Sequence, residues 1–318
     1  MATGKQQKRL FMTGASGYIG SVVTEFAAMD GYDVHALSRS ETSDEKLRSL
    51  GAVPVRGDLT SLDVLRRESA EADTVIHLAT AYTIGVGTYD AVMSVDMAAV
   101  DAIADGLAGT NKPLVITSGT LLAEADPTGA ETTEASPPSS HPLAARSKTE
   151  QHSLALARRG IQVVGVRLAP YTYGRGGSGI KLFMGMSARA GNVTCVNGGK
   201  NHTTVVHVDD AARLYLLAAQ KGKAGEVFNA SSSTNFTARQ IFDAIAAALE
   251  VPVRDITYED AQTQLGETFA WFLQAENRAS GAKARKELGW QPKGTSILDE
   301  INHGSYQPVA QALRKPPA

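Results

Sequence analysis

The chain of 318 residues is long enough for one large domain or two smaller ones, with a substantial buried core. Its 33 acidic and 31 basic residues leave a formal net charge of -2, which argues against nucleic acid or an anionic membrane as a partner. The single cysteine, Cys195, excludes an intramolecular disulfide and a cysteine-based zinc cluster. Residues 1–8 lack the apolar region of a signal peptide, and no run approaches the ~20 apolar residues of a membrane span. We therefore expect a cytoplasmic protein without a bound metal.

A glycine-rich loop at residues 13–20 (TGASGYIG) lies between a short apolar run and an amphipathic stretch with helical spacing. The order strand, glycine loop and helix is typical of a dinucleotide-binding turn, although an ordinary glycine-containing turn is the alternative. Gly14 allows the sharp turn, Gly17 lets the backbone approach a pyrophosphate, and Gly20 lets the helix pack closely on the strand. The predicted cofactor contacts of this loop are Gly14, Ser16, Gly17, Tyr18 and Ile19.

The second expected strand, residues 32–37, ends in Ser38 and Arg39. An NAD-preferring site carries an acidic side chain at this place, which accepts hydrogen bonds from the adenosine ribose. Here no carboxylate is present, and the Arg39 guanidinium can bind a 2′-phosphate through several donors. The sequence therefore predicts NADP(H) in preference to NAD(H), with a solvated arginine at a strand end as the alternative.

Apolar runs and helical patterns alternate through the first half of the chain. The expected strands after the second are residues 52–56, 74–78, 113–118 and 161–168, and the expected helices are residues 44–50, a helix from about Ser61, residues 89–107 and residues 143–159. This alternation predicts an α/β fold with a Rossmann-type, doubly wound parallel sheet. Residues 119–141 interrupt the pattern with prolines and small polar residues, so we expect there either a lid or binding loop or a disordered segment.

A change of composition at Ala169 marks the expected domain boundary. We expect residues 1–170 to form the dinucleotide-binding domain and residues 171–318 to form mainly a smaller C-terminal substrate-binding lobe. Segments near residues 205–230 are expected to complete the sheet of the first domain. The helices expected in the second half lie near residues 238–249, 261–276 and 282–288.

Ligands of an open parallel sheet lie beyond the carboxyl ends of its strands, so residues 79–82 should face the cofactor. Asp58 and Thr60 also follow a strand, and they can either cap the next helix or line the adenine end of the site. His77 lies inside its strand. It is predicted to be a packed structural histidine rather than a base.

Seven short motifs follow one another along the chain, and their order and spacing together are specific. They are TGASGYIG at residues 13–20, GDL at 57–59, HLA at 77–79, TSG at 117–119, SKTE at 147–150, VHVDD at 206–210 and FNA at 228–230. With them the sequence resembles the extended and atypical branches of the short-chain dehydrogenase/reductase superfamily, the group of nucleoside-diphosphate-sugar epimerase and dehydratase-like proteins. The resemblance implies that Asp58 and Leu59 approach the adenine. It also implies that Leu78, Ala79 and Thr80 line the cofactor and that residues 207–210 belong to the scaffold.

In this superfamily a tyrosine four residues before a lysine carries the proton transfer, because the spacing places both side chains on one helix face. Lys148 matches the lysine and can bind the nicotinamide ribose. Ala144 stands at the tyrosine position, and none of the nine tyrosines has a lysine four positions on. Ser118 or Thr120 can still hydrogen-bond a substrate carbonyl, or they can merely satisfy the local backbone.

The usual proton donor is therefore absent, and another side chain can take its place. The residues that can act as this acid are Tyr82, Tyr171, Tyr173 and His141. Tyr82 is preferred because it follows the fourth strand, at the edge where the ligand is expected. The catalytic candidates are therefore Lys148, Ser118, Thr120 and Tyr82.

Three functions fit these observations. The first is an NADP(H)-dependent reductase of a small or medium-sized organic carbonyl or imine, which explains a retained cofactor site beside an altered acid. The second is a non-redox isomerase, dehydratase or epimerase-like catalyst on the same fold, and the third is an NADP(H)-sensing binding protein without chemistry. The sequence identifies neither the substrate nor the oligomeric state, which leaves a homodimer open.

Overall fold

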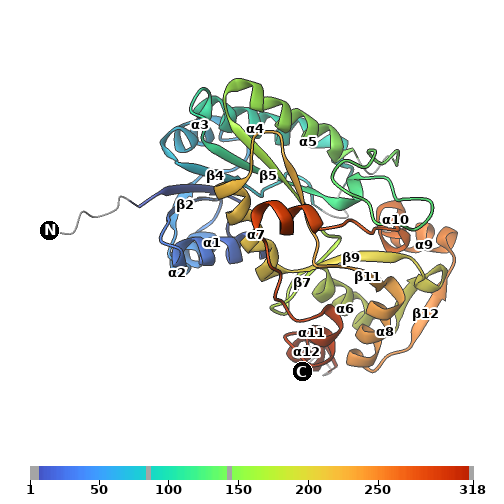
Figure 1. Cartoon of the computed structure of the whole chain (residues 1–318). Coiled ribbons are helices and arrows are strands. Elements are labelled where there is room, and N and C mark those ends of the chain that lie inside the picture. Colours follow the sequence, from blue (N-terminus) through green and yellow to red (C-terminus); the bar gives the residue numbers. More distant parts are fainter. Residues whose placement is uncertain (1–6, 84–86, 142–144, 315–318) are drawn as a thin grey trace.

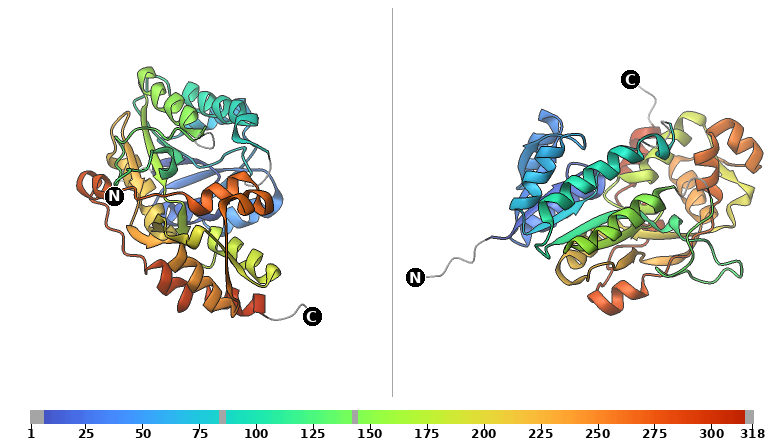
Figure 2. Two further views of the ribbon diagram at one scale, coloured as in Figure 1. Left: turned by 90° about the vertical axis from the view of Figure 1, so that its right-hand side faces the viewer. Right: turned by 90° about the horizontal axis from the view of Figure 1, so that it is seen from above.

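The computed structural model describes residues 7–83, 87–141 and 145–314. Two parts lie side by side (Figure 1), which we name the sheet domain and the C-terminal lobe. The sheet domain holds a seven-stranded sheet and its covering helices, and the C-terminal lobe holds two smaller sheets and six helices among the described residues. Seen from above (Figure 2), the blue N-terminal segment and the orange helices of residues 258–274 lie toward opposite ends of the molecule.

All neighbouring strands of the seven-stranded sheet are parallel, in the order β10-β6-β5-β4-β1-β2-β3. Its strands are β1 (Arg9–Thr13), β2 (Asp33–Ser38), β3 (Val53–Arg56), β4 (Thr74–His77), β5 (Pro113–Gly119), β6 (Gln162–Leu168) and β10 (Val227–Ala230). The four residues of β4 are all buried, as expected for a strand covered on both faces. The strand order reverses between β1 and β4, so a crevice for a ligand is expected there. The predicted doubly wound α/β fold is confirmed.

Helices cover both faces of this sheet (Figure 1). They are α1 (Tyr18–Met29), α2 (Glu41–Ser49), α3 (Leu62–Glu71), α4 (Met93–Leu107), α5 (Arg146–Ala155) and α7 (Val208–Lys221). One buried apolar cluster joins α1 and α7 to the sheet, and a second joins α3 and α4. Helices α3 and α4 pack closely because residue 106 is glycine: a Cβ there would lie 2.4 Å from the Arg66 carbonyl oxygen.

The C-terminal lobe is built around a third apolar cluster. Its strands are β7 (Tyr171–Tyr173), β8 (Val193–Val196), β9 (His202–His207), β11 (Ser233–Thr237) and β12 (Val253–Ile256). Its helices are α6 (Ser178–Ala190), α8 (Ala238–Leu249), α9 (Tyr258–Leu265), α10 (Glu267–Gln274), α11 (Ile297–Asn302) and α12 (Gln307–Arg314). Helix α8 starts with a capping box between Thr237 and Gln240, which satisfies backbone N–H groups of its first turn.

The segment near residues 205–230 divides between the two parts. Strand β10 pairs with β6 and completes the seven-stranded sheet, as expected. Strand β9 instead pairs with β7 and β11 in a separate three-stranded sheet, so the expectation that residues from 205 onward extend the main sheet is wrong for β9. Both strands are buried along almost their whole length, and the sequence pattern does not distinguish which sheet a buried strand joins.

Residues 119–141 form an ordered loop that packs against the C-terminal lobe. A short turn of 3-10 helix, Thr120–Leu122, follows β5, and bridges join Ala123 to Pro138 and Thr132 to Ala279. The Glu131 carboxylate accepts a hydrogen bond from the Thr234 hydroxyl at 2.5 Å. The expectation of disorder is therefore wrong, and a lid or binding loop stays a prediction.

Several expected helices are interrupted where the backbone changes direction. Residues 89–107 split into a 3-10 turn (Tyr89–Ala91) and α4, and residues 261–276 split into α9 and α10 at Gly266, whose φ is +83°. Helix α5 begins at Arg146 and continues as a 3-10 turn (Leu156–Arg159), while residues 143 and 144 of the expected helix lie outside the described residues. A π-helical turn, Ala284–Leu288, stands at the expected third helix.

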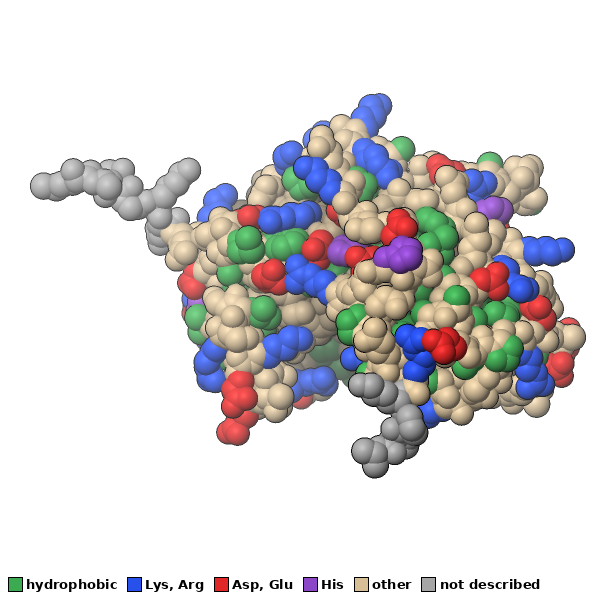
Figure 3. All heavy atoms as spheres, turned by 90° about the horizontal axis from the view of Figure 1, so that it is seen from below, with side chains coloured by type: hydrophobic (Ala, Val, Ile, Leu, Met, Phe, Trp, Pro, Cys, Tyr) green, Lys and Arg blue, Asp and Glu red, His purple; other side chains and the backbone are tan. Residues whose placement is uncertain are grey.

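The surface shows no concentration of one charge on the face seen from below. In Figure 3, Lys and Arg side chains are interspersed with Asp and Glu side chains. None of the helices in the described ranges combines the length and the apolar character that crossing a membrane requires.

Candidate active site

The glycine-rich loop forms a cradle of bare backbone at the switch point between β1 and β4. Gly14 has φ of +70°, and a Cβ at this residue would lie 2.8 Å from the Ala79 backbone nitrogen. A Cβ at Gly20 would lie 2.1 Å from the Gly14 carbonyl oxygen, so α1 approaches β1 as closely as the backbone permits. Gly17 precedes α1 without any side-chain cap, which leaves the first N–H groups of the helix available to an anion.

A cavity of about 510 Å³, which we name the edge cavity, opens beside this cradle. It is lined by Gly14, Ser16, Gly17, Leu37, Arg39, Ser43, Asp58, Leu59, Thr60, Leu78, Ala79, Thr80, Ala81, Tyr82, Thr83 and Val95. The cavity therefore brings together nine of the predicted cofactor contacts from the ends of β1, β2, β3 and β4. Its backbone donors and the absence of Cβ atoms at the loop fit the pyrophosphate of a dinucleotide.

Two cations stand at the β2 side of the edge cavity. Arg39 is exposed and forms no ion pair or hydrogen bond with the part of the chain that the structure describes. Lys46 of α2 donates a hydrogen bond from Nζ to the Ser16 carbonyl oxygen at 2.8 Å, which ties α2 to the glycine loop. The guanidinium of Arg39 is thus available to an anionic group of a ligand.

Asp58 lines the cavity and also organises its own turn. Its Oδ1 accepts hydrogen bonds from the Thr60 backbone N–H at 2.8 Å and from the Thr60 hydroxyl at 2.7 Å. These hydrogen bonds lower the pKa of the Asp58 carboxyl below its ordinary value because they stabilise the carboxylate. Both roles considered from the sequence, turn capping and a place on the cavity wall, are therefore compatible in the structure.

A buried hydrogen-bond network lies beneath the edge cavity. Thr13 Oγ1 and His77 Nδ1 are 2.8 Å apart, and the Ala79 backbone N–H donates to Thr13 Oγ1 at 3.2 Å. Burial lowers the pKa of His77 to about 4, because the charged imidazolium is disfavoured away from water. His77 is thus a neutral, packed histidine at neutral pH, as the sequence predicted.

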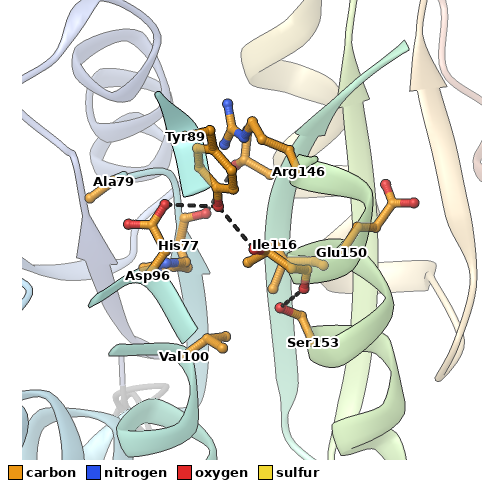
Figure 4. A pocket seen from close by; sticks show the side chains of 11 residues that line it. His77, Ala79, Tyr89, Asp96, Val100, Ile116, Arg146, Glu150 and Ser153 are labelled. Atoms are coloured by element: carbon orange, nitrogen blue, oxygen red, sulfur yellow. Dashed lines mark hydrogen bonds between the residues drawn. The ribbon is translucent and has the colours of Figure 1, made fainter. Parts of the chain in front are cut away.

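Asp96 anchors the segment that follows β4. Its carboxylate accepts hydrogen bonds from the Thr80 hydroxyl at 2.6 Å, the Ala81 backbone N–H at 2.6 Å and the Tyr89 hydroxyl at 3.0 Å. Figure 4 shows how Tyr89 also reaches toward α5, where its hydroxyl oxygen lies 2.9 Å from Thr149 Oγ1 and accepts a hydrogen bond from it. This network fixes the backbone at the rim of the edge cavity.

The two predicted hydroxyl candidates lie in buried polar networks. The Ser118 hydroxyl donates to the Glu150 carboxylate, which is also paired with Arg167 at 2.6 Å. The Thr120 hydroxyl donates to Asn277 Oδ1 at 2.8 Å. Neither side chain lines the edge cavity, and each already satisfies a structural partner.

Lys148 projects from the first turn of α5. Its side chain is 67% exposed, and its Nζ lies 3.9 Å from Asp90 Oδ1. It does not line the edge cavity. Ala144, at the position of the family's tyrosine, lies outside the described residues.

A second cavity, of about 450 Å³, lies between the sheet domain and the C-terminal lobe, and we name it the interlobe cavity. The sheet domain contributes Tyr18, Ile19, Tyr82, Gly119, Leu121, Leu122 and Arg146 to its wall. The C-terminal lobe contributes Pro170, Thr172, Ser178, Gly179, Leu182, Phe183, Thr268, Phe269, Trp271 and Phe272. Tyr82 lines both cavities, so they adjoin at this residue.

Tyr18 joins the glycine loop to the C-terminal lobe. Its hydroxyl donates to the Gly174 carbonyl oxygen at 2.8 Å, and a Cβ at Gly177 would lie 2.5 Å from its ring. Burial raises the pKa of Tyr18 far above its ordinary value. Tyr18 and Ile19, predicted as cofactor contacts, thus lie on the wall of the interlobe cavity.

The structure separates the four candidate acids. The Tyr82 hydroxyl forms no hydrogen bond within the described ranges, and its ring meets Tyr89 edge-on at a centroid distance of 6.0 Å. Tyr171 and Tyr173 are buried in the C-terminal lobe, where burial raises the pKa of both. His141 stacks on Trp271 at a centroid distance of 4.5 Å. Of the four, only Tyr82 lines both cavities.

Two functional features were missed in the sequence. Arg146 lines the interlobe cavity, but its place in a helical pattern gave no signal that it faces a ligand. Residues 268–272 (TFAWF) form an aromatic wall, but they read as part of an ordinary apolar helix face. Among the described residues, no group of three or more His, Cys, Asp or Glu side chains is arranged to hold a metal ion.

Comparison with known proteins agrees with this geometry. The model of the NAD dependent epimerase/dehydratase family matches residues 10–231. An uncharacterized protein of Saccharomyces cerevisiae is 32% identical over 296 residues, covering 92% of this chain and 97% of the relative. A 4-hydroxy-2-methyl-3-oxo-4-farnesyl-3,4-dihydroquinoline-1-oxide ketoreductase of Stigmatella aurantiaca is 26% identical over 328 residues, covering 90% of this chain and 93% of the relative.

The fold is shared with UDP-glucose 4-epimerase of Thermus thermophilus, solved in complex with NAD. The TM-score is 0.75, with 20% sequence identity and coverage of 96% of this chain and 99% of the epimerase. The protein is thus an enzyme of a class that uses a nicotinamide dinucleotide. The chain therefore belongs to the NAD dependent epimerase/dehydratase family.

Proposed function

We propose that the protein is an NADP(H)-dependent reductase of a small or medium-sized organic carbonyl or imine. The observation that carries this proposal is the junction of the two cavities at Tyr82. A dinucleotide in the edge cavity and an organic molecule in the interlobe cavity would meet beside a phenol that has no other hydrogen-bond partner in the described residues. The ketoreductase among the relatives supports the same reaction class.

The preference for the phosphorylated cofactor rests on Arg39. The guanidinium is exposed on the wall of the edge cavity, and it has no carboxylate partner within the described ranges. A 2′-phosphate would supply that partner through charge-assisted hydrogen bonds. The β2 end carries no acidic residue that could accept hydrogen bonds from an unphosphorylated ribose.

The chain's own residues would bind the dinucleotide, orient the substrate and protonate the substrate's carbonyl oxygen. When bound, the reduced nicotinamide supplies a hydride. Residues 13–17 would hold the pyrophosphate, Lys148 would leave Asp90 to bind the nicotinamide ribose, and Tyr82 would donate its phenolic proton to the carbonyl oxygen of the substrate. The Tyr82 phenolate is then reprotonated from water. A protonated imine needs no such donor, because its nitrogen already carries the proton.

The test is loss of NADPH absorbance with a panel of ketones, aldehydes and cyclic imines. We expect turnover with some members of the panel, and Tyr82→Phe to lower kcat for ketones by about 100-fold or more, because general acids contribute on this scale. Reduction of imines should change less than about threefold in the same variant. Tyr258→Phe, a change of the same size on α9 outside both cavities, should leave both reactions unchanged.

Absence of NADPH oxidation with every ketone, aldehyde and imine of the panel would overturn the reductase proposal. Equal losses for ketones and imines in Tyr82→Phe would show instead that Tyr82 shapes the site without donating the proton.

A further inference from the structure

The wall of the interlobe cavity is unusually aromatic. Phe183 from α6 and Phe269, Trp271 and Phe272 from α10 line it, with Leu121 from the sheet domain opposite. Phe183 and Phe272 stack at a centroid distance of 6.1 Å with an interplanar angle of 25°. Aromatic rings grouped in this way offer apolar surface on which a flat apolar molecule can pack.

Arg146 is the charged residue of this wall within the described part of the chain. Its guanidinium carbon lies 5.4 Å from the centroid of the Tyr89 ring, beside which it is drawn in Figure 4. It forms no ion pair and no hydrogen bond with any residue in the described ranges, although it is half-buried. A half-buried guanidinium without an acceptor favours a ligand that brings an oxygen to it.

The same wall disfavours a nucleoside-diphosphate sugar. A diphosphate and several hydroxyl groups require many donors and acceptors, because a buried polar group without a partner costs free energy. The described wall offers one guanidinium, no carboxylate and the hydroxyls of Tyr18, Tyr82, Thr172, Ser178 and Thr268, of which Tyr18 and Thr172 already donate to backbone carbonyl oxygens. An apolar ring with a single oxygen needs only one of these partners.

We infer that the interlobe cavity binds a flat, apolar aromatic ketone or aldehyde whose rings pack against the α10 aromatics and whose carbonyl oxygen accepts hydrogen bonds from Arg146. This inference names the substrate class of the reductase proposed above and rests on that function. The volume of the interlobe cavity, about 450 Å³, is within the range of pockets for small organic ligands. Arg146 is a specificity-determining residue in this role, and Tyr82 remains the proton donor.

Binding can be measured without cofactor or turnover. Of the two tryptophans, Trp271 lines the cavity, whereas Trp290 is buried and donates its indole N–H to the Asp210 carbonyl oxygen. Titration of the full chain with 2-acetylnaphthalene should therefore quench tryptophan fluorescence in a saturable way. UDP-glucose over the same concentration range should not.

A pair of variants on α6 tests whether the ligand lies in the cavity. Gly179 lines the cavity, and a Cβ there meets only the Phe183 ring at 3.8 Å, so Gly179→Leu fills space without a backbone clash. It should weaken binding of 2-acetylnaphthalene by about 20-fold or more. Gly185→Leu is the matched control, because a Cβ at Gly185 meets only Arg189 at 4.0 Å and the residue lies outside the cavity. It should change binding by less than about threefold.

A pair of ligands tests Arg146. Arg146→Met keeps an extended side chain and removes the hydrogen-bond donors, so it should weaken binding of 2-acetylnaphthalene by about tenfold. It should weaken binding of 2-ethylnaphthalene, which lacks the oxygen, by less than about twofold. Thermal unfolding of each variant checks that the fold is retained.

Three outcomes would overturn the inference: saturable quenching by UDP-glucose but not by 2-acetylnaphthalene, equal binding in Gly179→Leu and Gly185→Leu, or equal losses for both naphthalenes in Arg146→Met. Saturable binding with the expected variant pattern supports the ligand class, even if no NADPH is consumed. That last result would overturn the reductase function alone, so the two proposals fail separately.

Discussion

The two cavities that meet at Tyr82 are built by different means. The edge cavity is formed largely by backbone at the ends of four neighbouring strands, and glycines at its centre leave room for the ligand. The interlobe cavity is formed by side chains from α5, α6, α10 and the loop after β5, which are far apart in the sequence. Ligand recognition therefore depends on conformation in the first cavity and on side-chain identity in the second.

This difference indicates that specificity for the substrate can change more easily than specificity for the cofactor. A backbone cradle tolerates few substitutions, because a Cβ added at Gly14 or Gly20 collides with another backbone atom. An aromatic wall on helices can exchange side chains without changing the path of the chain. The similar proteins include an epimerase solved in complex with NAD and a ketoreductase, so proteins that resemble this chain act on different substrates.

The largest expected effect comes from Gly14→Ala. The residue has φ of +70°, and its Cβ would lie 2.8 Å from the Ala79 nitrogen, so the cradle must open. We expect the dissociation constant of NADPH to rise by about 100-fold or more, measured by NADPH fluorescence. Binding of 2-acetylnaphthalene in the interlobe cavity should change by less than about threefold.

Gly31→Ala is the control for backbone strain alone. Gly31 has φ of +85°, and a Cβ there meets nothing within 4 Å. It should therefore cost roughly 1 kcal/mol of stability and leave NADPH binding intact. Loss of both ligands in Gly14→Ala would contradict the separation of the two cavities.

The next effect is the choice between the two dinucleotides. Arg39→Asp removes the guanidinium from the edge cavity and adds a repelling charge, so NADPH should bind about 30-fold more weakly, which is about 2 kcal/mol. NADH should change by less than about threefold, because a carboxylate can accept hydrogen bonds from the ribose. Isothermal titration with both cofactors measures the two dissociation constants.

Arg48→Asp makes the same charge change on α2 outside the edge cavity. It should shift both dissociation constants by less than about twofold. Equal losses of NADPH and NADH in Arg39→Asp would mean that Arg39 does not read the phosphate.

Much of the fold was predictable because its signals are local. The buried run of β4 and the glycines at residues 14, 17 and 20 specify a strand and a turn without information from elsewhere in the chain. The partner sheet of β9 was not predictable, because a buried strand reads the same whichever sheet it joins. Gly266 divides two helices for a local reason, its left-handed φ, which the apolar pattern concealed.

The cofactor half of the site was also more readable than the substrate half. Arg39 and Asp58 could be placed because each lies within two residues of the end of a strand, and strand ends converge at one edge of a parallel sheet. Arg146 and Trp271 face the same cavity from helices that are 125 residues apart, and no local pattern records that meeting. Ser118 looked catalytic from its position, but its hydrogen bond to Glu150 depends on a helix elsewhere in the chain.

A third prediction concerns the polar network beneath the edge cavity. Burial lowers the pKa of His77 in the folded protein to about 4 from the ordinary value of 6.5. As the pH falls, the unfolded chain therefore takes up a proton at this histidine before the folded protein does. The contribution of neutral His77 to the free energy of unfolding is thus fully present above pH 6.5 and is lost progressively toward pH 4. About 2 kcal/mol should be lost between pH 7.5 and pH 5.

Urea unfolding of the wild type and His77→Asn at both pH values isolates this effect, since other groups titrate in both proteins. The stability advantage of the wild type over His77→Asn should shrink by about 2 kcal/mol at the lower pH. His303→Asn, at an exposed histidine, should track the wild type. A constant difference between the wild type and His77→Asn would show that His77 takes up its proton equally in the folded and unfolded states, so that burial does not lower its pKa.

The smallest effect should come from Lys148→Ala. Lys148 is 67% exposed and 3.9 Å from Asp90, and a pair of this kind contributes at most about 1 kcal/mol, so the lysine can leave it for a ribose hydroxyl. The dissociation constant of NADPH should rise by about fivefold, which corresponds to about 1 kcal/mol. Lys200→Ala, remote from both cavities, should change it by less than about 1.5-fold. An unchanged value in Lys148→Ala would remove the lysine from the cofactor site, and the edge cavity would then hold the dinucleotide from the β1 to β4 side alone.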